Sequence, residues 1–484
     1  MVLKSSFTIA FLLLTVSWAD PASAKWILRY QLTFDEALTT ADAELCFTDS
    51  TPRLMVVPGK DSYLKGPVRI RAGGVLPKRS GGFDSRTLKA GDCVTYAVDL
   101  AQMAKEGGVD SARRFGDTLL VRNGPWLLQP AVEFDAGDID ATVVIKAPKG
   151  TFHLLPWPAV TGQANTYRLG PLAFVTHSQL AIGRTLELET VEAGHTRTHV
   201  GILGGTRRAT RKGINAWVSS AVEAVASIYG GRFPADQLCV FAFPVIGLSA
   251  PVLHGYAQRG GGGHVLLYLN MMAKDDELPG EWVAIHELFH LAMPWVPESW
   301  LGEGMATWYG EVLRVRGGHL TERKFWEGLL DGFDRGRRTG TGRTLVDESK
   351  EMHKTRAYKR VYWGGAFYAM ALDVALREGS GGAKTLDGAM VAVRKRFSHS
   401  RPVPGLELLA GIDDWYGKPL AVPMARRAMS ATTFPDVAPL LKRLGISLVN
   451  GKIVLDDTAP LAHIRNALTV TIDRRTRARS TWSC

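Results

Sequence analysis

The 484-residue sequence has only four cysteines, no internal repeat and no nucleic-acid-binding module. After residue 24 it also has no apolar run near the ~20 residues that a membrane helix needs. These absences argue against a repetitive, nucleic-acid-binding or membrane-spanning mature chain. The basic residues behind the net charge of +11 are scattered, except in the run 474–479, and a solvated surface is the simplest interpretation. The composition is typical of a globular protein, and the length favours two to four domains.

The first 24 residues have the pattern of a targeting segment. Lys4 precedes a short apolar run over Phe7–Ala19, and Ala22-Ser23-Ala24 is a small-residue cleavage site. We predict a cleaved signal peptide over residues 1–24, and therefore a secreted or periplasmic protein. The alternative is an uncleaved anchor. No cysteine lies at the cleavage point, which argues against a lipoprotein.

Export permits disulfide bonds. Cys46 and Cys93 both fall in a strand-rich region, and we predict that they pair. Cys239 lies in an apolar run, Leu238–Phe243, that is typical of a buried strand, so a buried free thiol is expected there. The pairing of Cys484 stays open.

The order of patterns along the chain predicts a multidomain α+β protein. Short β-branched runs between Gly, Pro and Asp clusters predict an N-terminal β-sandwich over residues 25–172. Strands and helices then mix over residues 173–345, where we expect a catalytic domain. Helical spacing dominates residues 346–445, and residues 446–484 form a C-terminal tail.

The central motif is His286-Glu287-Leu288-Phe289-His290, in a predicted helix over residues 281–293. Residues i and i+4 of a helix share one face, so the two imidazoles can bind one zinc ion. The glutamate beside the first histidine can then act as general base on a water molecule. The alternative is a pair of surface histidines on a helix.

A catalytic zinc site needs a third protein ligand. The extended motif with a third histidine is absent, because Met293 and Val296 occupy those places. Glu303 is the best candidate, since Pro294 and Pro297 force a turn that lets the next helix pack back on the first. The rivals are Glu298 and Glu311, on the same predicted helix.

Trp300-Leu-Gly-Glu-Gly304 after this motif resembles the gluzincin zinc metallopeptidases, which include aminopeptidase N. The closest resemblance is to the glycyl aminopeptidase family, from the segments Ala226–Pro234, Gly261–Tyr268 and Tyr362–Arg377. It extends over about residues 143–378. The resemblance implies a thermolysin-like catalytic domain, a Zn²⁺ cofactor bound by His286, His290 and Glu303, and Glu287 as general base.

The same resemblance implies that Tyr362, in a Tyr-x-x-Gly segment, donates a hydrogen bond to the oxyanion. Tyr358, one turn earlier, is its rival, and a half-buried structural tyrosine is the other interpretation. Zinc-assisted hydrolysis with a carboxylate base and a phenol donor is coherent chemistry.

Two departures concern the substrate. Gly263 stands where the family has a glutamate that meets a free amine, so only His264 remains of this substrate-binding pair. The family's trailing PDZ domain is also missing. We therefore expect blocked or internal peptide bonds to be tolerated, with a peptide pairing along Val265–Leu269. The rival interpretation is that Glu281 or Glu311 reaches the amine.

The sequence thus predicts a zinc peptidase that acts on a peptide or protein substrate. One alternative is a non-catalytic envelope-binding protein on a peptidase scaffold, and another is a different zinc hydrolase with the same site. The natural substrate, the choice between exo- and endopeptidase activity, and the oligomeric state are not indicated by the sequence.

Overall fold

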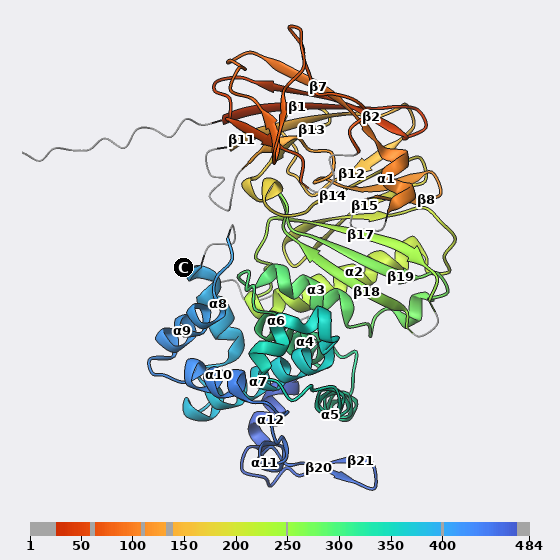
Figure 1. Cartoon of the computed structure of the whole chain (residues 1–484). Coiled ribbons are helices and arrows are strands. Elements are labelled where there is room, and N and C mark those ends of the chain that lie inside the picture. The colour runs from red at the N-terminus through yellow and green to blue at the C-terminus, as the bar shows by residue number, and fades with distance from the viewer. Residues whose placement is uncertain are drawn as a thin grey trace, which may run out of the picture.

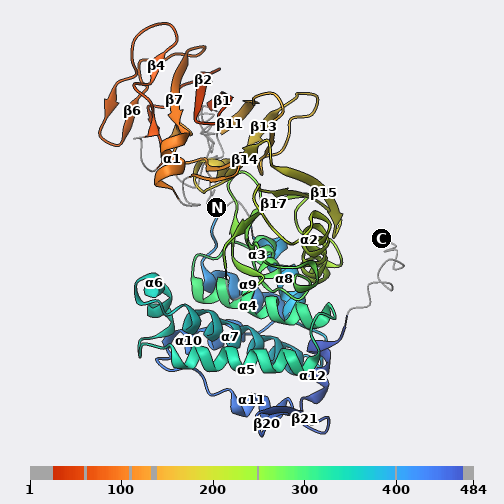
Figure 2. The same ribbon diagram turned by 90° about the vertical axis from the view of Figure 1, so that its right-hand side faces the viewer.

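The protein has a mixed α+β architecture in three tiers. A computed structural model describes residues 26–58, 63–107, 112–131, 139–247, 250–397 and 401–471. Figure 1 shows a β-rich part at the top, a sheet with helices beneath it in the middle, and a helical part at the bottom. The perpendicular view in Figure 2 shows the same three tiers. The predicted signal peptide, the basic run 474–479 and Cys484 lie outside the described residues.

The N-terminal tier is built from sheets that share one core. A six-stranded sheet has the order β13-β11-β1-β2-β7-β4, and a four-stranded sheet has the order β10-β3-β6-β5. Their strands are β1 (Trp26–Phe34), β2 (Thr40–Phe47), β3 (Leu54–Val56), β4 (Arg69–Ile70), β5 (Lys78–Arg79), β6 (Gly82–Asp84), β7 (Cys93–Asp99), β10 (Gln129–Pro130), β11 (Ile139–Lys146) and β13 (Thr166–Leu169). A helix, α1 (Leu100–Glu106), follows β7. Alternate residues such as Leu28, Tyr30 and Leu32 are buried, as the period of a strand requires.

A disulfide bond joins two strands of the six-stranded sheet. Cys46 in β2 lies directly opposite Cys93 in β7, and their sulfur atoms are 2.05 Å apart. Cys239 is buried and its thiol is free. Both arrangements are those that the sequence predicts.

A third sheet extends the N-terminal tier beyond its predicted end. Its order is β12-β14-β9-β8, with β8 (Ala112–Phe115), β9 (Thr118–Arg122), β12 (Phe152–Leu154) and β14 (Gln179–Gly183). Because β14 pairs with β9, this tier continues to Gly183 rather than ending at residue 172. A short 3₁₀ turn, Pro171–Phe174, lies at the predicted boundary, within the same region. The predicted sandwich is therefore a three-sheet structure, and β1 and β11 within it are parallel.

The middle tier is a five-stranded sheet of order β15-β16-β17-β19-β18. Its strands are β15 (Glu187–Ala193), β16 (Thr196–Ile202), β17 (Gln237–Val245), β18 (Val252–Gln258) and β19 (His264–Asn270). β16, β17 and β19 run parallel, and β15 and β18 are antiparallel edge strands. Alternate residues serve two cores: Val240 and Val265 pack with the helices, whereas Phe241 and Leu266 face the N-terminal tier.

Two helices, α2 (Arg211–Ala226) and α3 (Val283–Ala292), cover one face of this sheet. The lower tier contains α4 (Ser299–Arg316), α5 (Glu322–Arg338), α6 (Leu345–Thr355), α7 (Tyr358–Gly379), α8 (Leu386–Arg396), α9 (Gly405–Tyr416), α10 (Ala421–Ser430) and α11 (Ala438–Arg443). None of the helices in the described ranges has both the length and the apolar character needed to cross a membrane.

The predicted C-terminal tail contains regular structure where it is described. A hairpin of β20 (Ile446–Val449) and β21 (Lys452–Leu455) precedes α12 (Ala462–Thr469). Ile464 and Leu468 are buried in the same core as α3, α4 and α7. This short amphipathic helix is stabilised by packing on α4 and α7, a tertiary effect that local sequence patterns do not reveal.

Candidate metal and active site

Three side chains from two helices converge at one point. His286 and His290 are one turn apart on α3, and Glu303 lies on α4. The Oε2 atom of Glu303 is 3.1 Å from Nε2 of His286 and 3.2 Å from Nε2 of His290. The two Nε2 atoms are themselves 3.2 Å apart. Two imidazoles and a carboxylate, grouped within 4.8 Å, are a ligand set that suits Zn²⁺.

The turn between α3 and α4 explains this convergence. α3 ends at Ala292, Pro294 and Pro297 keep the connection non-helical, and α4 begins at Ser299. His286 has only 2% of its side chain exposed, which contradicts the interpretation of surface histidines. Burial acts to raise the pKa of Glu303, but the two imidazoles outweigh it and hold that pKa well below its usual value. Glu303 therefore stays a carboxylate, as a metal ligand must.

The two rival glutamates on α4 are engaged elsewhere. An Oε2 atom of Glu298 accepts a hydrogen bond of 2.9 Å from the backbone N–H of Gly405. Glu311 forms an ion pair of 2.9 Å with Arg314. Neither carboxylate belongs to the three-residue cluster.

Glu287 lies on α3, and its side chain packs against the edge strand β18. A Cβ atom on Gly255 of β18 would stand 2.6 Å from Cγ of Glu287, so only glycine permits this close approach. The backbone N–H of Ala257 donates a hydrogen bond to the Glu287 carboxylate. Burial is the main cause that raises the pKa of Glu287 to about 7. A carboxylate with a pKa near neutrality is suited to accept and then donate a proton.

Tyr362 of α7 lies beside this cluster, whereas Tyr358 does not. The Tyr362 ring stacks on the His286 ring, with centroids 6.0 Å apart and an interplanar angle of 5°. Its hydroxyl donates a hydrogen bond to Glu303, and burial and the nearby carboxylates hold its pKa well above the usual value. The phenol therefore stays protonated and able to donate. Tyr358 is more exposed and hydrogen-bonds to His353 at 3.2 Å.

Glycines in the two sequence motifs bring α4 and α7 together. A Cβ atom on Gly304 would overlap the backbone of Gly365, and one on Gly365 would overlap the carbonyl oxygen of Trp300. The two helix backbones therefore touch, which sets Tyr362 against Glu303. The sequence motifs mark this contact, although their spacing alone does not indicate a helix crossing.

The strand at the free edge of the sheet is β18, not β19. β19 is paired on both sides, with β17 and β18, so Val265–Leu269 has no edge to offer a peptide, and our expectation for that segment is wrong. Among the described strands, β18 pairs only with β19. β18 was not predicted from the sequence, although a glycine between polar and aromatic residues, in Leu253-His-Gly-Tyr-Ala257, was an available signal.

Gly263 and His264 are not placed to bind a substrate beside the metal-site residues. His264 is fully buried and hydrogen-bonds to Gln258 and to the carbonyl oxygen of Gly262, each at 3.0 Å. Burial lowers the pKa of His264 to about 4, so it is a neutral structural residue. A Cβ atom on Gly263 would face Leu291, next to His290 rather than on the ligand side. The expectation of a substrate contact through His264 is therefore corrected.

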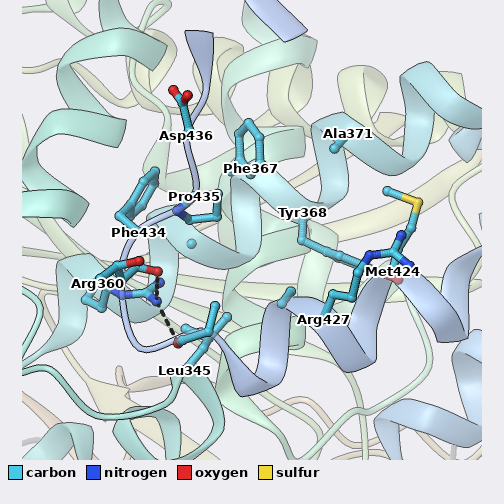
Figure 3. Close-up of a pocket in the computed structure, with 14 residues that line it drawn as sticks. Leu345, Arg360, Phe367, Tyr368, Ala371, Met424, Arg427, Phe434, Pro435 and Asp436 are labelled. Carbon is cyan, nitrogen blue, oxygen red and sulfur yellow. Dashed lines mark hydrogen bonds between the residues drawn. The ribbon is translucent and has the colours of Figure 1, made fainter. Parts of the chain in front are cut away.

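A well-formed cavity of about 330 Å³ lies elsewhere, on the opposite face of α7 from Tyr362. Figure 3 shows Arg360, Phe367 and Phe434 around it. Arg360 is two residues before Tyr362, and this spacing in a helix directs the side chains to opposite faces. The metal-site residues do not line this cavity.

Comparison with solved structures shows the fold. An aminopeptidase N family protein from Idiomarina loihiensis matches with a TM-score of 0.68 and 16% identity, over 87% of this chain and 78% of that chain. A variant M1 zinc metallopeptidase from Deinococcus radiodurans, bound to a Tyr-Ser-Ala substrate, matches with a TM-score of 0.54 and 14% identity, over 85% and 94% of the two chains. No family model and no curated protein sequence matches this chain.

Proposed function

We propose that this protein is a zinc-dependent peptidase of the gluzincin type. The observation that carries the proposal is the convergence of His286, His290 and Glu303, with Glu287 and Tyr362 beside them. The fold shared with M1 zinc metallopeptidases supports the same activity. His286, His290 and Glu303 would hold the zinc ion, which when bound supplies a Lewis acid that polarises the carbonyl and activates water.

The protein's own residues would perform the proton transfers. Glu287, buried against β18, accepts a proton from the attacking water and returns it to the leaving amine. Tyr362 donates its hydroxyl proton in a hydrogen bond to the developing oxyanion. The high pKa of Tyr362 supports this role, because the phenol keeps its proton at neutral pH.

An extended peptide is the substrate that the edge strand favours. β18 passes directly over Glu287, and its outer side has no strand partner among the described residues. A peptide that adds to this edge would place one of its carbonyl groups near Glu287. His254 and Tyr256 are exposed on β18 and would flank it.

We propose tolerance of blocked or internal peptide bonds. At the end of β18, the Gln258 amide hydrogen-bonds to His264, so this position offers no carboxylate to a free amine. Of the two rivals, Glu311 pairs with Arg314. Glu281 accepts backbone hydrogen bonds from Trp282 and Val283, and its buried Oε2 atom has no hydrogen-bond partner among the described residues. Matched peptides with free and acetylated N-termini test this. Cleavage of the free series alone, one residue at a time, would instead make the enzyme an aminopeptidase.

The metal assignment is tested by elemental analysis. We expect one zinc ion per chain in the wild type and a strong loss of zinc in Glu303→Ala. Glu298→Ala is a matched control on the same helix, because its carboxylate caps Gly405 instead. Mass spectrometry of a peptide library should then show cleavage that a chelator stops and added zinc restores. Full zinc retention in Glu303→Ala would contradict this ligand set.

Export is part of the proposal. The sequence pattern of residues 1–24 supports a cleaved signal peptide and a secreted or periplasmic location. The disulfide bond between Cys46 and Cys93 supports the same compartment, because such bonds persist in oxidising environments. Sequencing the N-terminus of the protein recovered from the culture medium or periplasm should begin at Lys25.

A further inference from the structure

Two cavities of similar size are lined by arginines, but only in the first does a carboxylate lie beside the positive charge. In the cavity of Figure 3, the Nε atom of Arg360 lies 3.6 Å from the Glu348 carboxylate, so the positive charge has a partner. The second cavity, of about 320 Å³, lies where all three tiers meet. We call it the junction pocket, and its lining includes Arg259, Arg394, Leu172, Leu238, Gly263 and Leu291. No acidic side chain lines it.

Arg259 enters the junction pocket from the turn after β18. Its Nη2 atom donates hydrogen bonds to the carbonyl oxygens of His290 and Met293, at the C-terminal end of α3. These partners are neutral dipoles, and a helix C-terminus stabilises a cation only modestly. Among the described residues, Arg259 forms a salt bridge with no carboxylate.

Arg394 enters the same pocket from α8. Its Nη2 atom donates a hydrogen bond of 2.6 Å to the carbonyl oxygen of Pro234. Its Nε and Nη1 atoms are buried and have no hydrogen-bond partner in the described part of the chain. The positive charge of Arg394 also repels that of Arg259. Two partly buried like charges that lack a carboxylate are costly, and an anion between them would remove that cost.

The glycine run 260–263 shapes the pocket through packing with the first tier. A Cβ atom on Gly261 would overlap Trp157, and one on Gly262 would overlap the carbonyl oxygen of Pro156. Gly261 and Gly262 can therefore carry no larger side chain, and the run brings Leu172 and Leu238 to the same cavity. The pocket thus combines a cationic end with apolar walls.

We propose that the junction pocket binds a small organic anion. A carboxylate or phosphate group would lie between the Arg259 and Arg394 guanidinium groups, which present the paired N–H donors that such groups prefer. A short apolar portion would pack on Leu172, Leu238 and Leu291. The proposal is independent of zinc and of hydrolysis.

The test is calorimetric titration of the mature protein with succinate, with inorganic phosphate and with uncharged succinamide. We expect succinate or phosphate to bind and succinamide not to bind. Arg394→Gln should weaken the binding about tenfold or more, the scale of a lost charge-assisted hydrogen bond. Arg396→Gln is the matched control, because Arg396 lies on the same helix and pairs with Asp414 at the surface.

Three results would overturn the proposal. The first is that neither anion binds the wild type. The second is that succinamide binds as well as succinate. The third is that Arg394→Gln and the control Arg396→Gln weaken binding equally. Arg259 is left unchanged because its substitution would also remove contacts at the end of α3.

The anion could be a free acid or an acidic side chain of a substrate, and a second measurement separates them. Cleavage of paired peptides that differ by glutamate or glutamine is compared in the wild type and Arg394→Gln. A glutamate preference that Arg394→Gln removes assigns the anion to the substrate. Equal cleavage together with succinate binding assigns it to a free acid. The calorimetry stands even if no peptide is cleaved.

Discussion

Two sites of opposite charge adjoin α3. In the first, two imidazoles, of His286 and His290, lie against the carboxylate of Glu303, an arrangement that attracts a cation. At the C-terminal end, Arg259 and Arg394 place two guanidinium groups together without a carboxylate, an arrangement that attracts an anion. One helix therefore contributes to both, through its side chains to the first and through its terminal carbonyl groups to the second.

The difference shows how burial acts on polar groups. Around Glu303, burial is opposed by charges of the other sign, and the carboxylate stays ionised. His264 borders the glycine run of the junction pocket. There burial outweighs the hydrogen bond to the Gly262 carbonyl oxygen, and the ring stays neutral. Histidines close in sequence to the same motif can thus be functional or structural, depending on their neighbours.

The largest expected effect is on the first site. Glu287→Gln should lower the rate of peptide cleavage by about 10²- to 10⁴-fold, because the water loses its base. Zinc content should stay at the wild-type level, since Glu287 is not part of the ligand cluster. Glu298→Gln should keep full activity, because that side chain accepts a hydrogen bond from Gly405 and is not part of the cluster. An active Glu287→Gln enzyme would refute the assignment of the base and would leave the first site as a metal site only.

A smaller effect is expected from the phenol beside the metal-site residues. Tyr362→Phe should lower kcat by about 100-fold, the scale for loss of one oxyanion donor. Tyr358→Phe should change kcat little, because that hydroxyl contacts His353 instead. Steady-state kinetics of the two variants, made side by side, sharpen the comparison. A larger loss in Tyr358→Phe would show that the roles are reversed.

The smallest expected effect is on the pH dependence of the free energy of unfolding, through His264 beside the second site. The pKa of His264 is about 4 in the folded protein against an ordinary value of 6.5, so the unfolded chain binds more protons between these values. The folded state should therefore lose about 2 kcal/mol from this residue as the pH falls from 7 to 5. Denaturant unfolding of His264→Gln should show a flatter dependence on pH than the wild type. The same change at exposed His463 is the control, and an equally flat curve there would contradict the buried, neutral state of His264.

Sequence patterns predicted the helical elements around the metal site closely. The expected helix over residues 281–293 corresponds to α3, and the next predicted helix, which carries Glu298 and Glu311, corresponds to α4. These predictions succeed because apolar spacing, two prolines and terminal glycines are local signals. The mixed α+β class follows from the same patterns. The end of the first tier was missed because β14 belongs to it only through pairing with β9, a strand more than 50 residues earlier.

The substrate side of the site was less predictable. Gly260–Gly263 and His264 match a family motif in sequence, yet the structure packs the glycines on the first tier and buries the histidine. Strand order decides which segment has a free edge, and nothing local distinguishes β18 from β19. The segment with an edge free to pair with a peptide is therefore Val252–Gln258, not Val265–Leu269.

Local sequence patterns were enough to predict the helix that carries His286 and His290. Two histidines four residues apart on a helix share a face whatever surrounds them, and the proline turn limits where the next helix can go. Which glutamate joins them, which tyrosine lies beside them and where the two arginines meet could be read only from the folded chain, because these contacts join distant segments. The Gly304–Gly365 contact sets α7 against α4, and α8 brings Arg394 to a turn that is more than 100 residues earlier.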